Sequence, residues 1–247
     1  MRSVVILVFI FFCSWSFSQE NKPSDPRVGL VLSGGGAKGL AHVGVLKILD
    51  SLGVRVDYVA GTSMGAVVGG LYASGYSGKQ LDSIIRSTKF DLLISDEIPR
   101  ESKTFYERKN GEKYALALPF NNFKINLPSS ISRGQNVFNL VSKLTLGVSG
   151  IEDFSKLPIP FYCIATNMET GNEVVLEHGN LAQAIAASSA LPTLFQPVIL
   201  DHKLLMDGGI VNNFPITGLA SKNIDIIIGV DYGGNDATVC TAIGIKP

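Results

Sequence analysis

Ser63 lies within residues 61–65, GTSMG, directly after the apolar residues 56–60. A Gly-x-Ser-x-Gly sequence between a strand and a helix is typical of a nucleophile elbow, a sharp turn that exposes a serine hydroxyl. Gly61 and Gly65 let neighbouring backbone approach where a Cβ would collide. The motif therefore predicts a reactive serine, although the same five residues also occur as an ordinary tight turn.

The segment after Ser63 predicts a helix that packs unusually close to a sheet. Its small residues recur at helical spacing: Gly65, Ala66, Gly69, Gly70, Ala73 and Ser74. Such a helix can direct its N-terminal N–H groups at a developing negative charge.

A second glycine-rich segment, residues 33–39 (SGGGAKG), follows a predicted buried strand at residues 27–32. The helical pattern behind it predicts one apolar face, made of Ala41, Val45, Ile48, Leu49 and Leu52. Consecutive glycines at the start of a helix expose backbone N–H groups, so this loop is a candidate anion site.

The anion at this loop is either a nucleotide phosphate or the oxyanion of an attacked ester. A phosphate-binding P-loop requires Gly-Lys followed by Ser or Thr, whereas here Lys38 precedes Gly39 and Leu40 follows. The dinucleotide pattern Gly-x-Gly-x-x-Gly requires an acidic residue about 20 positions further on, where this chain has residues 61–63. The oxyanion interpretation is favoured because it places both glycine loops at adjacent strand ends of one sheet.

Asp207 is the candidate base for the serine. It precedes Gly208 and Gly209 and follows the strand-like residues 203–206. An Asp-Gly pair is by itself most often a turn. A carboxylate with a pKa near 4 is also a weak base, unless its site raises that pKa or holds it within hydrogen-bond distance of the hydroxyl.

None of the histidines fits a catalytic triad. His42 is expected to pack or form a hydrogen bond on the first helix, and His178 lies in a polar turn before a helix predicted at residues 181–188. His202 stands at the tip of a predicted hairpin. A serine–aspartate dyad is the simplest interpretation.

Over residues 27–233 the chain resembles the patatin-like phospholipase family. The resemblance rests on GGGAKG (34–39), GTSMG (61–65) and DGG (207–209) in the family's order, with AHVGVL (41–46) and AASSALP (186–192) in support. It implies a lipid acyl hydrolase with Ser63 as nucleophile and Asp207 as proton acceptor, without a metal or cofactor. The expected oxyanion donors are the N–H groups of Gly34, Gly35, Gly36, Ala37 and Met64. The remaining motif positions are Gly39, Gly61, Gly65, Gly208 and Gly209.

The expected fold is α/β: a three-layer α/β/α patatin-like fold with a mainly parallel central sheet, a nucleophile elbow and a hairpin insertion. Strands are predicted at residues 161–165 and 224–230, helices at 78–85 and 134–146, and the hairpin at 106–114 around an Asn-Gly pair. One set of apolar residues forms either a lid or acyl-chain groove, or simply a cover for the sheet: Leu92, Leu93, Phe120, Phe123 and Ile125.

The composition is that of an ordinary globular chain. It has 247 residues, 46 % of them hydrophobic and 17 % charged, and a formal net charge of zero. This is long enough for one sizeable core, and no basic excess suggests nucleic acid. Cys163 is predicted to be a buried free thiol, without a disulfide framework.

Residues 1–18 are predicted to be a signal peptide, because a positive start precedes a short apolar core and small residues. The alternatives are a retained anchor or lipidation at Cys13. Residues 19–26 read as a linker, 27–233 as the hydrolase domain, and 234–247 as an irregular tail that belongs to a soluble form or a truncated chain. Export predicts a location in the periplasm, at the outer membrane or outside the cell.

The expected partner is a phospholipid or another acyl-ester lipid, met at a membrane surface that the protein contacts transiently. Two other functions remain open at this point. One is a patatin-like lipid-binding module without turnover, and the other is a nucleotide-binding protein.

Overall fold

The computed structural model describes residues 25–96, 100–106, 108, 120–121, 124–125, 130–232 and 241–243. With η for a 3₁₀ helix, its elements in chain order are β1 (Val28–Leu32), η1 (Gly36–Ala41), α2 (His42–Ser51), β2 (Tyr58–Thr62), α3 (Met64–Ala73), α4 (Gly78–Ser87), α5 (Phe90–Ser95), η2 (Arg100–Ser102), β3 (Phe120–Asn121), β4 (Lys124–Ile125), α7 (Gln135–Leu144), η3 (Leu146–Val148), η4 (Phe154–Lys156), β5 (Phe161–Asn167), β6 (Glu173–Leu176), α8 (Leu181–Ser188), β7 (Val198–Leu200), β8 (Lys203–Asp207), η5 (Gly208–Ile210), α9 (Ile216–Ala220), β9 (Ile226–Val230) and β10 (Thr241–Ile243).

The main sheet is parallel at its centre and antiparallel at its margins. Its strand order is β10-β9-β1-β2-β5-β8-β7, and β6 also pairs with β5. The pairs that join β9, β1, β2 and β5 are parallel, whereas β6, β7, β8 and β10 run antiparallel to their neighbours. Because β1 and β2 are buried along their whole length, their sequences are continuously apolar, as expected for parallel strands covered on both faces.

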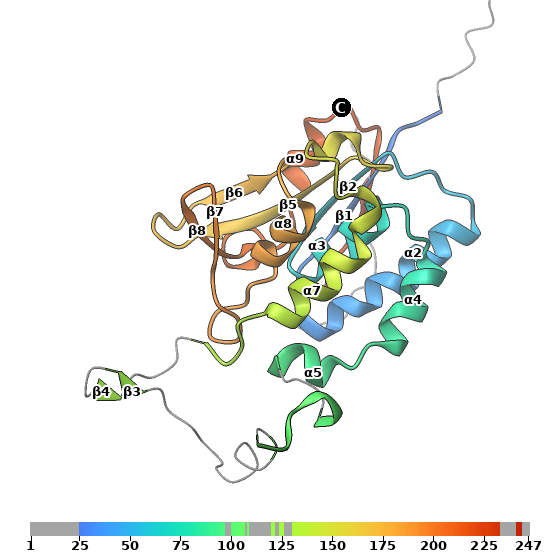
Figure 1. Ribbon diagram of the computed structural model, residues 1–247. Coiled ribbons are helices and arrows are strands. Elements are labelled where there is room, and N and C mark those ends of the chain that lie inside the picture. The colour runs from blue at the N-terminus through green and yellow to red at the C-terminus, as the bar shows by residue number, and fades with distance from the viewer. Residues whose placement is uncertain are drawn as a thin grey trace, which may run out of the picture.

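Alternate residues of the central strands supply two separate cores. Leu30 and Leu32 of β1 belong to the larger core, which packs against α2, α3, α4, α7 and α8. Val31 points to the other face, into a smaller core with Tyr162 and Leu219 of α9. Figure 1 shows α3, α7, α4 and α2 gathered on one side of the strands. The expected three-layer α/β/α arrangement is confirmed.

The apolar face predicted for the first helix is confirmed only in part, at Val45 and Leu49. The structure buries His42, Val43, Leu46 and Leu49, while Ile48 and Leu52 are 58 % and 71 % exposed. Residues 36–41 form the 3₁₀ helix η1, with about three residues per turn, and α2 begins only at His42. Ala41 therefore lies in η1, and within α2 the buried stripe includes residues 42, 43 and 46 in place of 48 and 52.

Other predicted elements are confirmed, with small shifts of their ends. The helix predicted at residues 78–85 is α4, whose Ser77 and Gln80 form a capping box. The helix predicted at residues 134–146 is α7, and the predicted helix at 181–188 is α8. The strands at 161–165 and 224–230 are β5 and β9.

The turn at His202 joins β7 to β8 as predicted. The hairpin predicted at residues 106–114 falls almost wholly outside the described residues, although the short ladder of β3 with β4 lies close behind it in the sequence. Four strands, β3, β4, β6 and β10, were not expected from the sequence pattern. Among the described residues, no helix is both long and apolar enough to span a membrane.

Candidate active site

Ser63 lies between β2 and α3, and its backbone is strained. Its φ of 54° and ψ of −120° are unusual for a residue other than glycine, and such a conformation costs about 1–3 kcal/mol. The N–H groups of Ala66 and Val67, in the first turn of α3, donate to the Ser63 carbonyl at 3.0 and 3.1 Å. The turn has the geometry of the nucleophile elbow that the motif predicts.

Close backbone contacts explain the two glycines of this motif. A Cβ on Gly61 would lie 2.4 Å from the carbonyl oxygen of Gly65, and one on Gly65 would lie 2.2 Å from that of Leu32. Backbone atoms cannot yield as the end of a flexible side chain can, so any larger residue would push α3 away from the sheet. The elbow therefore requires glycine on both sides of Ser63.

The strand register brings Asp207 to Ser63 across 144 positions of sequence. Thr62, at the end of β2, pairs with Ile164 of β5, so Ser63 is level with Ala165. Asp207, at the end of β8, pairs with Ala165 from the antiparallel side. The two candidate catalytic residues thus meet beside one residue of β5.

Their side chains are in direct contact. Ser63 Oγ donates to Asp207 Oδ2 at 2.5 Å, and Asp207 Oδ1 accepts from the N–H of Gly209 at 2.7 Å. The carboxylate is 3 % exposed. Burial raises the pKa of Asp207 by more than the hydrogen bonds from Ser63 and Gly209 lower it, which makes the carboxylate a stronger base than an exposed one.

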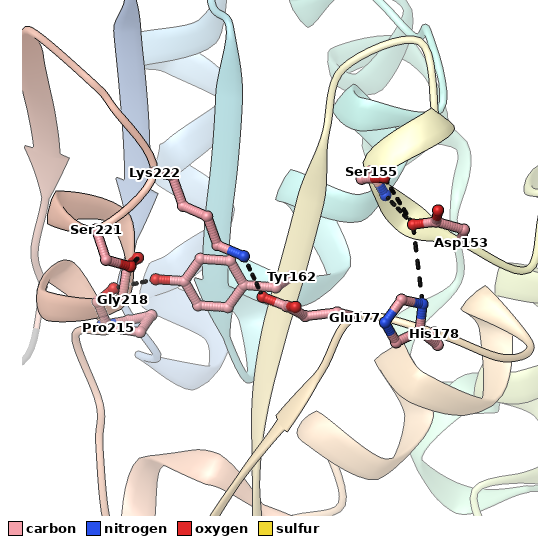
Figure 2. A network of polar contacts seen from close by, with 9 residues as sticks. All are labelled: Asp153, Ser155, Tyr162, Glu177, His178, Pro215, Gly218, Ser221 and Lys222. Atoms are coloured by element: carbon pink, nitrogen blue, oxygen red, sulfur yellow. Dashed lines mark hydrogen bonds and ion pairs between the residues drawn. The ribbon is translucent and has the colours of Figure 1, made fainter.

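Two of the three histidines, His42 and His178, have other partners. His42 Nε2 lies 2.9 Å from the Ser33 carbonyl oxygen, and its ring packs against Tyr232. His178 Nδ1 is 3.8 Å from Asp153 Oδ1, with a side chain that is 73 % exposed, and Figure 2 shows the ring turned toward that carboxylate. His202 lies in the β7–β8 turn with a φ of 60°. Within the described residues, the only side-chain base in contact with Ser63 Oγ is a carboxylate.

The glycine loop lies beside the elbow because β1 and β2 are neighbours, with Leu32 paired to Gly61. The Gly34 N–H donates to the Asn213 carbonyl at 3.1 Å and cannot turn to an oxyanion without breaking that bond. The first N–H groups of a helix have no partner within it, and η1 begins at Gly36. The expected donor set therefore narrows to Gly35, Gly36, Ala37 and Met64.

Ser63 stands where two cavities meet. An open cavity of about 330 Å³ contains both dyad residues, with the glycine loop on one side and Leu191, Pro192 and Ile210 on the other. A second cavity, of about 400 Å³, leads from Ser63 and Met64 between α3, α4, α5 and α7 and is lined almost entirely by apolar residues. Ser63 therefore has an open entrance of mixed polarity on one side and an apolar interior on the other.

The expected apolar lid or groove is only partly found. Leu93 of α5 lines the apolar cavity, whereas Leu92 is not among the lining residues and its carbonyl accepts from Asn136 Nδ2. Phe120 and Ile125 pair in the β3–β4 ladder, and Phe123 lies outside the described residues. Much of the lining comes from α3, α4 and α7, whose roles the sequence does not reveal.

Residues 30–220 match the family model described as patatin-like phospholipase. The chain belongs to the patatin-like phospholipase family. It is 34 % identical over 214 residues to an uncharacterized NTE family protein of Mycobacterium tuberculosis, covering 87 % of this chain and 51 % of that protein. It is 33 % identical over 212 residues to a lysophospholipase of Emericella nidulans, covering 85 % of this chain and 12 % of that enzyme.

The patatin-like chain thus spans about half the length of the mycobacterial relatives that it matches. Its fold is similar to the crystal structure of VipD from Legionella pneumophila, with a TM-score of 0.53 and 19 % identity over 86 % of this chain and 51 % of that one. At this level of identity the likeness bears on the fold alone.

Asn213 is a site residue of this patatin-like chain that the sequence reasoning missed. Its carbonyl accepts from the Gly34 N–H, and its Nδ2 donates to the Gly34 carbonyl at 3.3 Å. The segment is anchored further along, where the Tyr162 hydroxyl donates to the Pro215 carbonyl at 2.6 Å, as Figure 2 shows. The contact of Asn213 with a loop 179 positions away is not visible in the sequence.

Proposed function

We propose that this domain is a serine carboxylic-ester hydrolase that cleaves acyl chains from phospholipids or lysophospholipids. The observation that carries the proposal is the 2.5 Å hydrogen bond from Ser63 Oγ to a buried carboxylate, Asp207, at the entrance of an apolar cavity. Family membership and the lysophospholipase relative support the same class of substrate.

In the first half of the reaction, Ser63 Oγ attacks the ester carbonyl carbon while its proton passes to Asp207 Oδ2. The carbonyl π electrons move to oxygen, and backbone N–H groups of Gly35, Gly36, Ala37 and Met64 stabilise that oxyanion. One well-placed donor is worth about 3 kcal/mol. Collapse of the tetrahedral intermediate breaks the C–O bond, and the leaving alcohol takes the proton from Asp207.

In the second half, water attacks the acyl-enzyme and gives its proton to Asp207. The same donors hold the second oxyanion, and collapse releases the fatty acid as Ser63 Oγ recovers the proton. Because Asp207 must begin each half-reaction ionised, its raised pKa sets a balance between base strength and the ionised fraction.

The apolar cavity is assigned to the acyl chain, and the open cavity to the glycerol and head group. Val67 and Leu71 on α3, with Leu140 on α7, line the apolar side, where a polar head group would lose its hydration without gaining partners. The ester carbon is then placed at the junction of the two cavities, next to Ser63.

The proposal is tested by incubating the protein with lysophosphatidylcholine and with diacyl phosphatidylcholine and measuring released fatty acid by mass spectrometry. We expect release by the unmodified protein and none above background with Ser63→Ala. A folded protein that releases no fatty acid from either lipid or from a short-chain ester would contradict the proposal.

We also propose that the protein is exported and loses residues 1–18, and that it meets its lipid at a membrane surface. The support is the leader-like sequence, which lies outside the described residues. Intact-mass measurement of the protein after expression with an export machinery tests this, because removal of the leader predicts an N-terminus near residue 19, and a full-length mass would contradict it.

A further inference from the structure

Ser188, at the end of α8, is fully buried beside the elbow. Its Oγ accepts a hydrogen bond from the Ser63 backbone N–H at 3.1 Å and donates one to the Ile164 carbonyl at 2.5 Å. The hydroxyl therefore links the backbone of the nucleophile to strand β5. Neither of these two hydrogen bonds involves the side chain of Ser63 or of Asp207.

The direction of these bonds is fixed by the chemistry of a hydroxyl. A serine hydroxyl has one proton and two lone pairs. Because the hydroxyl proton is donated to the Ile164 carbonyl, a lone pair of Oγ is available to accept from the Ser63 N–H. Any other rotation of the hydroxyl would break the bond to Ile164. This orients the Thr62–Ser63 peptide, from which the unusual φ of Ser63 directs its side chain to Asp207.

Both residues of the dyad are connected by hydrogen bonds to strand β5. Ser188 joins Ser63 to Ile164 of β5. Two residues further along the same strand, Thr166 Oγ1 donates to the Asp207 carbonyl at 2.8 Å. Two buried hydroxyls thus connect the backbones of the nucleophile and of the base to Ile164 and Thr166, two residues of one strand. A shift of either backbone would change the 2.5 Å separation between Ser63 Oγ and Asp207 Oδ2.

We propose that Ser188 is a positioning residue, which holds the strained elbow so that Ser63 Oγ stays aligned with Asp207. This inference rests on the proposed hydrolase function. Removing the hydroxyl leaves a buried N–H without its partner and lets the strained φ of Ser63 relax. Misplacement of a reacting group by about 1 Å can cost about 100-fold in rate.

The test compares the rate of fluorophosphonate labelling of Ser63, and kcat and KM for a short-chain ester, in the unmodified protein and in Ser188→Ala. We expect labelling and kcat to fall together by about 10- to 100-fold, with KM little changed. Ser74→Ala is the matched control, because Ser74 Oγ donates to the Gly70 carbonyl at the far end of α3, and its rates should equal those of the unmodified protein.

A purely structural role for Ser188 predicts a lower melting temperature with an unchanged labelling rate per folded molecule, and that result would overturn the proposal. If Ser188→Ala does not fold, Ser188→Cys supplies the test, since a thiol of similar size is a weaker acceptor, and a labelling rate equal to that of the unmodified protein would again overturn it. If Ser63 of the unmodified protein is not labelled at all, the hydrolase function itself fails, and this inference falls with it.

Discussion

Asp207 is subject to two opposing influences that together define the chemistry of the dyad. Burial disfavours its ionised form, whereas the hydrogen bonds from Ser63 and Gly209 favour it, and burial has the larger effect. Burial makes the carboxylate more basic, but it also lowers the free energy of unfolding, because the folded protein holds a desolvated charge. Without a histidine between them, the carboxylate can take the serine proton only if Ser63 Oγ and Asp207 Oδ2 stay within hydrogen-bond distance. The backbone contacts around both residues maintain that distance.

Replacement of Asp207 by Asn should abolish turnover without lowering stability at pH 7. The folded-state pKa of Asp207 is raised above its ordinary value of 3.8, so the unfolded chain releases this proton more readily and ionisation favours unfolding as pH rises. Asn cannot ionise, and its side-chain oxygen can still accept from Gly209.

Urea unfolding at several pH values checks this prediction. We expect Asp207→Asn to be at least as stable as the unmodified protein at pH 7, with this advantage shrinking as the pH falls toward 4. A large loss of stability in Asp207→Asn at pH 7 would show that the carboxylate stabilises the fold. In the unmodified protein, kcat/KM should rise with pH through an apparent pKa above 3.8.

At the level of elements, glycines let α3 approach β1 and β2 closely at its N-terminal end, while its apolar side chains pack in the larger core. A Cβ on Gly65 would lie 2.2 Å from the Leu32 carbonyl oxygen, and one on Gly208 would lie 2.2 Å from the Ile164 carbonyl oxygen. These contacts let the loops of both dyad residues approach the strands on which they depend. By contrast, a Cβ on Gly44 in α2 would meet nothing within 4 Å.

Gly65→Ala should therefore lower the free energy of unfolding by about 2–3 kcal/mol, while Gly44→Ala should raise it by about 0.5–1 kcal/mol, since glycine in a helix interior costs that much relative to alanine. Urea denaturation of both variants measures the difference. Equal stabilities for the two variants would mean that α3 can move away from β1 at little cost.

The helices around the apolar cavity should determine which acyl chains are accepted. Leu140 of α7 is half-buried and lines this cavity, so Leu140→Trp should fill part of it. We expect kcat/KM for a p-nitrophenyl palmitate substrate to fall about tenfold or more, with p-nitrophenyl acetate little affected. An equal change for both esters would place the acyl chain elsewhere.

At the scale of the whole molecule, exposed apolar side chains lie next to the segments that line the entrance to the site. Ile131 and Val211 are 76 % and 43 % exposed, and Ile131 is tied by its N–H to the Thr193 carbonyl, next to Pro192 of the entrance. Lys38 and Arg133 are exposed on the same segments. Asp207 also lines this entrance, and Asp96 accepts hydrogen bonds from Ser132 and Gln135. We therefore expect the exposed apolar residues, rather than a net charge, to contact a lipid surface.

The double variant Ile131→Asp with Val211→Asp should bind phosphatidylglycerol-containing vesicles less than the unmodified protein and hydrolyse lipid in them more slowly. Hydrolysis of a soluble short-chain ester should not change. Leu52→Asp is the control, because Leu52 is 71 % exposed at the end of α2 remote from the glycine loop. Vesicle sedimentation measures binding, and undiminished binding by the double variant would rule out this entrance as the docking face.

The sequence predicts those parts of the fold and of the site that are set by residues close together in the chain. The strand, turn and helix around Ser63, the glycine loop after β1 and the Asp-Gly-Gly turn are local, and each follows from glycine chemistry and apolar patterning. The contacts of Ser188 and Asn213 join segments 125 and 179 positions apart, and no local pattern specifies them. The buried face of α2 was only partly predicted, because this helix has apolar residues on several sides and two of them, Ile48 and Leu52, stay exposed.

The most direct test of the dyad is to treat the processed protein with a fluorophosphonate, then measure intact mass and map the modified peptide, beside Ser63→Ala and Asp207→Asn. We expect a single adduct on Ser63, absent from Ser63→Ala and formed at least 100-fold more slowly in Asp207→Asn. No adduct on the folded protein, or an adduct that persists in Ser63→Ala, would contradict Ser63 as the nucleophile.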